Sequence, residues 1–103
     1  MKLIALYKHP EDMATFDEAY FKTHLPLIEK VPGIQRTVIT RINRTVMGDG
    51  FYLMAEMYFA SADALKAGMR SPEMAVAGEN LNSFASGLTI LMFGEEQDSI
   101  LSG

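Results

Sequence analysis

The stretch DMATFDEAYFKTHLPLIEKVPG, residues 12–33, decides the fold of this chain because it predicts one long amphipathic helix that is interrupted near its end. At about 100° per residue, its apolar side chains fall on one side of the helix, and His24 falls among them. Tyr20 precedes His24 by four residues, so the two rings should touch. Pro26 lacks an N–H group and disfavours helical angles at Leu25. We therefore expect the helix to kink directly after His24.

Short apolar and β-branched runs on both sides of this helix predict four strands. Asp49-Gly50 predicts a tight hairpin turn between the second and third strands. The strands are expected at residues 2–8, 34–46, 51–59 and 88–93, and a second helix at residues 61–84. The resulting order, βαββαβ, is that of an α+β ferredoxin-like plait, in which two helices cover one face of an antiparallel sheet.

The second face of this sheet is predicted to be apolar as well. Residues 51–59 and 88–93 carry large apolar side chains at both alternating positions. Two helices cannot cover both faces, and a large exposed apolar face marks an interaction surface. The sequence therefore predicts a homodimer through the face that the helices leave bare.

Composition limits the classes of partner and compartment. We expect one domain over residues 1–103. A net charge of −4 without a basic tract argues against nucleic-acid binding. No apolar run approaches the roughly 20 residues of a membrane helix, so no membrane association is expected. The absence of cysteine fits a reducing cytoplasm.

His24 is the strongest candidate for chemistry, because histidine moves protons near neutral pH. The alternative is a core histidine whose ring nitrogens bond the carbonyl groups freed by Pro26. Tyr20 and Tyr7 are candidate substrate-binding residues, although each taken alone is more typical of a core aromatic. His9 is expected at the surface.

Glu56 is an acid in an apolar strand, which is costly unless it is paired. With the turn centred on residues 48–49, Arg41 would face Glu56 across the hairpin, and we expect these two to pair. In the alternative, Glu56 faces the pocket and orients a substrate or His24. Asp17 is expected to serve the helix dipole and the surface.

No motif indicates a metal or a cofactor. The chain has two histidines and no cysteine, without the spacing of paired metal ligands. It also lacks a GxGxxG fingerprint, a P-loop and a GxSxG elbow. We therefore expect neither a metal nor a cofactor.

The aromatic, histidine and proline residues of the long helix resemble the signature of the EthD family, which is named for an association with ethyl tert-butyl ether degradation. The residues that carry this resemblance are Phe16, Tyr20-Phe21, His24-Leu25-Pro26-Leu27 and Val31-Pro32-Gly33. The resemblance extends over the whole chain in length and element order, whereas the specific motif covers residues 16–33. It implies a dimeric α+β barrel and favours a site at His24.

Barrels similar to this one host isomerases, cyclases, decarboxylases and oxygenases. The resemblance thus implies a cofactor-free enzyme acting on a small apolar molecule, with His24 as acid/base and Tyr20 and Tyr7 positioning a carbonyl or hydroxyl group. A non-catalytic ligand-binding or accessory protein of a degradation pathway remains an alternative, as does a structural dimer whose motif only holds the kink. Haem enzymes occur on related barrels, but no residue besides His24 favours that interpretation.

Overall fold

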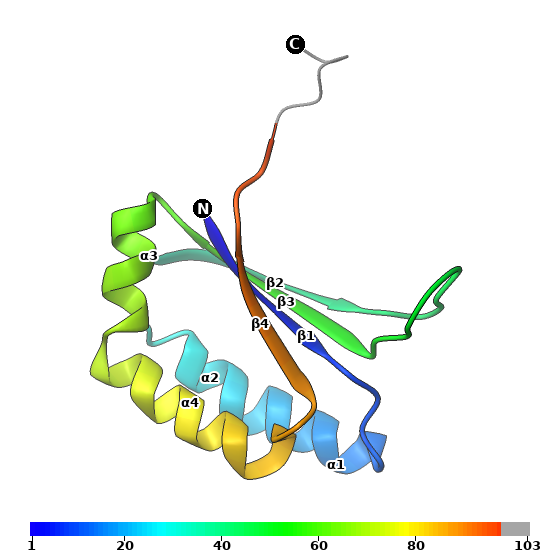
Figure 1. Ribbon diagram of the computed structural model, residues 1–103. Helices are drawn as coiled ribbons and strands as arrows, with labels where there is room; N and C mark the ends of the chain where they lie inside the picture. Colours follow the sequence, from blue (N-terminus) through cyan, green and yellow to red (C-terminus); the bar gives the residue numbers. More distant parts are fainter. Residues whose placement is uncertain (98–103) are drawn as a thin grey trace.

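The computed structural model describes residues 1–97 as a four-stranded antiparallel sheet with helices packed on one face (Figure 1). The sheet order is β2-β3-β1-β4, which places the two central strands, β1 and β3, side by side. This arrangement confirms the ferredoxin-like α+β class. The strands are β1 (Lys2–Tyr7), β2 (Ile34–Arg41), β3 (Leu53–Phe59) and β4 (Thr89–Gly94), and the helical segments are α1 (Met13–Glu18), η1 (Ala19–His24), α2 (Leu25–Ile28), α3 (Ala62–Met69) and α4 (Pro72–Ala85).

The first helix is continuous through Pro26, so the predicted interruption is wrong; the helix changes instead from a π-helical segment ending at His24 to an α-helix beginning at Leu25. Segment η1 is a π-helical turn, in which the Leu25 N–H donates to the Tyr20 carbonyl five residues earlier. Leu25 itself keeps helical angles, with φ −58° and ψ −43°. A π-turn widens the helix before Pro26 and thereby relieves the clash of the proline ring with the preceding turn.

Three of the helices begin after a residue whose side chain caps the first turn. Asp12 and Ser61 accept hydrogen bonds from the backbone N–H groups three residues later, as N-cap residues do. Ser71 caps α4 in the same way, and Pro72 occupies its first turn, where no N–H is required.

The connection between β2 and β3 is a long loop, and the predicted two-residue hairpin is wrong. Strand β2 ends at Arg41 and β3 begins at Leu53. Tyr52 fixes where the chain rejoins the sheet, because its side chain is buried and its N–H donates to the Tyr7 carbonyl of β1. Burial of Tyr52 and Leu53 thus determines the register, and the local Asp49-Gly50 signal does not.

This register contradicts the predicted pair between Arg41 and Glu56. Arg41 lies opposite Leu53, on the helix-covered face, whereas Glu56 lies opposite Val38, on the other face. Glu56 instead forms an ion pair with Lys2, with 2.6 Å between the Lys2 Nζ and a carboxylate oxygen.

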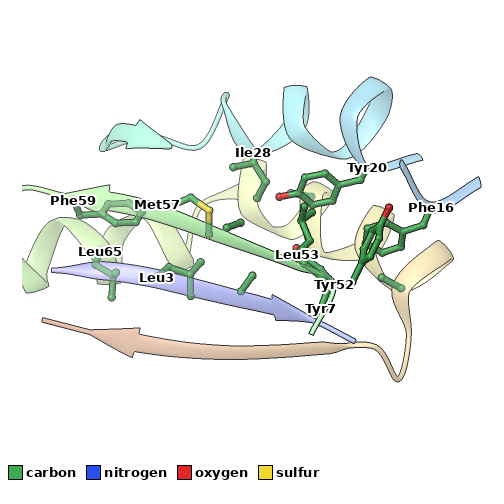
Figure 2. Packing of buried hydrophobic residues seen from close by; sticks show 14 residues of the cluster. Leu3, Tyr7, Phe16, Tyr20, Ile28, Tyr52, Leu53, Met57, Phe59 and Leu65 are labelled. Carbon is green, nitrogen blue, oxygen red and sulfur yellow. The ribbon is translucent and has the colours of Figure 1, made fainter. Parts of the chain in front are cut away.

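The core lies between the helices and the inner face of the sheet (Figure 2). Aromatic rings fill one end of it, where Phe16 contacts the edges of Tyr7 and Tyr52 and lies parallel to Tyr20. Smaller and more flexible side chains fill the middle, including Ala55, Met57 and Leu3. This difference in side-chain size leaves room beside His24.

Candidate functional site

A cavity of about 60 Å³ lies between the first helix, α4 and the sheet. Figure 2 shows Tyr20 and Ile28 from the helix approaching Tyr7, Leu3 and Met57 from the sheet. Apart from His24 and two tyrosines, the lining is apolar and includes three methionines. The complete lining is Leu3, Ala5, Tyr7, Tyr20, His24, Ile28, Met57, Met69, Met74, Ala77, Gly78, Leu81 and Leu91.

His24 is buried, with 2% of its surface exposed, and its two ring nitrogens differ in surroundings. Nδ1 lies 3.2 Å from the Oδ1 of Asn80 on α4. Nε2 has no hydrogen-bond partner among residues 1–97. Among residues 1–97, every fully buried side-chain nitrogen or oxygen has a hydrogen-bond partner. Nε2 therefore keeps some surface that a water-sized molecule can contact, whereas a histidine that only ties off the core would have both ring nitrogens bonded within the protein.

Burial lowers the pKa of His24 below its ordinary value of 6.5, and the hydrogen bond to Asn80 offsets only part of this effect. Desolvation has this sign because it disfavours the charged imidazolium. His24 is consequently neutral at pH 7, and a neutral ring can accept a hydrogen bond or a proton.

The two predicted tyrosines share the cavity with His24. The ring centroids of Tyr20 and His24 are 5.5 Å apart, and those of Tyr7 and Tyr20 are 5.3 Å apart. Burial raises the pKa of Tyr20 to about 12. The pKa of Tyr7 is raised more strongly, mainly by burial and to a smaller extent by the neighbouring Tyr20. Both hydroxyl groups therefore stay protonated near neutral pH and can donate hydrogen bonds to a ligand.

Comparison with known proteins supports the family. The family model of the EthD domain matches residues 8–87. A solved EthD-family protein of Bacillus halodurans is 47% identical, with a TM-score of 0.88 over 93% of this chain and 97% of that one. The chain belongs to the EthD family.

Other similar proteins extend this comparison. An uncharacterized 11.0 kDa protein from the thcB–thcC intergenic region of Rhodococcus erythropolis is 31% identical over 93% of this chain and 94% of that protein. A dimeric ferredoxin-like protein of Jannaschia has the same fold, with 14% identity, a TM-score of 0.69 and coverage of 92% and 98%.

In this EthD-family chain, Glu56 does not join the other predicted site residues. It lies on the sheet face turned away from the helices and is absent from the cavity lining. Its negative charge is compensated by the ion pair with Lys2, in which the two charged groups are 2.6 Å apart. The structure therefore brings together His24, Tyr20 and Tyr7 and leaves Glu56 outside, as it does the exposed His9.

Two contacts of His24 were not predicted from the sequence. Asn80, which bonds His24, and Phe84, whose ring centroid lies 5.9 Å from that of His24, both come from α4. The small Ala77 of α4 was the available signal, because it is fully buried beside the cavity and lets this helix approach closely. Asn80 lies three residues after Ala77 and thus on the same face.

Asp17 has a larger role than the predicted surface position. It accepts hydrogen bonds from the Tyr52 hydroxyl at 2.7 Å and from Arg41 at 3.3 Å. Arg41 also donates to the Tyr52 hydroxyl at 2.6 Å. This triad ties α1 to the ends of β2 and β3, close to the aromatic end of the core.

Residues 1–97 show neither a metal-binding cluster nor a membrane-spanning helix. No group of three or more His, Asp or Glu side chains is placed to hold a metal ion. No helix in this range has the length and apolar character needed to cross a membrane.

Proposed function

We propose that the cavity beside His24 binds a small, largely apolar organic molecule that carries one polar group. The observation that carries this proposal is that His24, whose Nε2 has no hydrogen-bond partner among residues 1–97, lines a cavity that is otherwise almost wholly apolar. Ligand sites commonly combine an apolar lining with a few convergent polar groups. Here the polar side chains that line the cavity are His24, Tyr20 and Tyr7.

The size of the cavity limits what it can enclose. A cavity of about 150 Å³ holds one benzene ring, so 60 Å³ accommodates only the polar end of such a ligand. A shallow apolar groove adjoins the cavity and shares Leu3, Met69 and Leu91 with it. The body of the ligand would extend toward this groove, and the flexible methionine side chains would adjust around it.

The proposed chemistry is cofactor-free proton transfer with His24 as the acid/base. A neutral imidazole takes a proton from a hydroxyl group or from a carbon next to a carbonyl, and the tyrosine hydroxyls stabilise the developing oxyanion. Isomerase, cyclase, decarboxylase and oxygenase reactions share such a step. A protein of the same fold, SnoaB of Streptomyces nogalater, is a cofactor-independent oxygenase, with 14% identity and a TM-score of 0.61. That likeness shows the fold, and the proposal itself rests on the geometry around His24.

We further propose that the chain forms a homodimer through the bare face of the sheet, meaning the side of Ile4, Leu6, Val38, Met54 and Met92. Four consecutive apolar residues of the edge strand β4, residues 90–93, are each at least 36% exposed. An exposed apolar edge of this kind favours association. The dimeric neighbours of the same fold support this arrangement.

Methyl NMR of methionine-labelled protein tests the ligand proposal. Phenol, cyclohexanone and tert-butanol serve as probes, each an apolar body with one oxygen. We expect at least one probe to shift the methyl signals of Met57, Met69 and Met74, which line the cavity. The signals of Met13 and Met47, which are exposed, should stay in place and serve as internal controls.

The matched variants are His24→Gln and His9→Gln. The first should fold and weaken probe binding at least tenfold, whereas the second should bind as the wild type does. Equal binding by wild type and His24→Gln, or no shift at the three cavity methionines with any probe, would overturn the proposal. Probe binding without turnover of any related substrate would restrict the function to binding.

A further inference from the structure

The contact between His24 and Asn80 determines which ring nitrogen carries the proton. An amide oxygen can only accept a hydrogen bond, so the nitrogen 3.2 Å from Asn80 Oδ1 must be the donor. A neutral imidazole has one N–H group, and placing it on Nδ1 leaves Nε2 as an acceptor.

Asn80 is placed to hold this tautomer. It projects from α4 beside Ala77, which is fully buried, so the helix backbone lies close to the first helix. Phe84, one turn further along α4, contacts the His24 ring, and Tyr20 contacts it from the first helix. These contacts limit rotation of the imidazole and keep Nδ1 directed at Asn80.

We propose that Asn80 is a positioning residue that fixes His24 with its proton on Nδ1, so that the site selects ligands that donate a hydrogen bond, such as phenols and enols, over pure acceptors such as ethers. This inference rests on the proposed function of the cavity. An ether oxygen offers Nε2 no proton, whereas a phenol O–H does.

Proton transfer from the ligand to His24 requires no further reactant. The ligand O–H bond breaks, its proton joins Nε2, and its electron pair stays on the oxygen as an oxyanion. The resulting imidazolium keeps its Nδ1–H bond to Asn80. The titratable groups that line the cavity with His24 are Tyr7 from β1 and Tyr20 from η1, and α4 faces the ring with Asn80 and Phe84, which do not titrate.

Long-range ¹H–¹⁵N NMR of the histidine rings tests the tautomer without any ligand. The chain has only two histidines, so His9→Gln assigns the spectrum. At pH 8, wild-type His24 should show a protonated Nδ1 and an unprotonated Nε2. Asn80→Leu should shift the ring toward a tautomer mixture, whereas Asn80→Asp should keep the wild-type tautomer and raise the pKa of His24. Asn82→Leu, an exposed change on the same helix, should have no effect. A protonated Nε2 in the wild type overturns the positioning role, even if Asn80→Leu does not fold.

Phenol, toluene and anisole test the ligand class, because phenol and toluene have nearly the same shape and anisole is an ether. We expect phenol to bind at least tenfold more tightly than toluene and anisole, with the advantage reduced in Asn80→Leu. Anisole binding as tightly as phenol overturns the ligand class while leaving the cavity as a site. If none of the three binds, the ligand class fails and the tautomer result stands by itself; the proposed function fails with it only if cyclohexanone and tert-butanol do not bind either.

Discussion

His24 shows how much of a site one residue can reveal before the structure is known. Helical spacing from Tyr20 places it in the apolar side of the first helix, and the structure confirms both its burial and its contact with Tyr20. Its partner Asn80 is 56 positions away, and no local pattern connects the two. Residues that act within one helix were therefore predictable, whereas those brought in by packing of α4 were not.

The buried imidazole should make stability depend on pH. Burial lowers the pKa of His24 in the folded protein below 6.5, so the unfolded chain binds a proton at a higher pH than the folded chain does. The contribution to stability is therefore complete above about pH 6.5 and decreases as the pH falls below that value. Each unit of pKa depression corresponds to about 1.4 kcal/mol.

Urea unfolding of wild type, His24→Gln and His9→Gln between pH 5 and pH 8 measures this dependence. The free energy of unfolding of wild type and His9→Gln should fall more steeply with acidification than that of His24→Gln. Equal slopes in wild type and His24→Gln would contradict the lowered pKa.

The Tyr52 hydroxyl should stabilise the fold through its bonds to Asp17 and Arg41, at 2.7 and 2.6 Å. Tyr52→Phe should lower the free energy of unfolding by about 1 kcal/mol. Tyr58→Phe is the matched control, because its hydroxyl makes only 3.5 Å contacts with Lys2 and Glu56. Thermal unfolding that shows an equal or larger loss for Tyr58→Phe would refute this role of Tyr52.

At the scale of elements, type and order were predictable, but the geometry at two junctions was not. The first helix was expected to kink directly after His24, and it instead accommodates Pro26 through the π-helical segment that precedes it. The β2–β3 hairpin was expected at residues 48–49, and burial of Tyr52 moves the pairing by several residues. In both cases tertiary packing overrides a local signal, because burying aromatic side chains is worth more than one turn preference.

Two glycines of the α3–α4 region should respond in opposite ways to alanine. A Cβ at Gly68 would lie 2.8 Å from the Phe59 ring and 3.0 Å from the Pro32 carbonyl oxygen. Gly68→Ala should therefore destabilise the fold by about 1–3 kcal/mol. A Cβ at Gly78, within α4, meets no atom within 4 Å, so Gly78→Ala should stabilise it by about 0.5–1 kcal/mol. Chemical denaturation of both variants checks the pair, and a stabilised Gly68→Ala would show that α3 packs less closely than described.

At the scale of the whole molecule, the apolar character of both sheet faces was readable from residues 51–59 and 88–93. Which residues lie on which face was not readable, because that depends on register. Leu53 and Met57 belong to the covered core, whereas Met54 lies on the bare face, paired with Leu6 and Thr40.

A charge on the bare face should therefore dissociate the proposed homodimer. Met54→Lys should weaken dimerisation by at least tenfold, because a lysine would be desolvated at the interface. Met13→Lys, an exposed change on α1, is the control and should leave the assembly unchanged. Sedimentation equilibrium at micromolar concentration measures both, and a stable folded wild-type monomer would contradict the dimer.

The central claim is that a ligand in the cavity contacts Nε2 of His24, and the ¹⁵N resonance of that nitrogen during a phenol titration tests it most directly. A hydrogen bond from the phenol hydroxyl should move the Nε2 signal upfield, toward the value of a protonated nitrogen. Its concentration dependence should match that of the Met57 methyl signal, since both line the same cavity. An Nε2 signal that stays in place while the Met57 signal saturates would contradict the account, because phenol would then bind without His24.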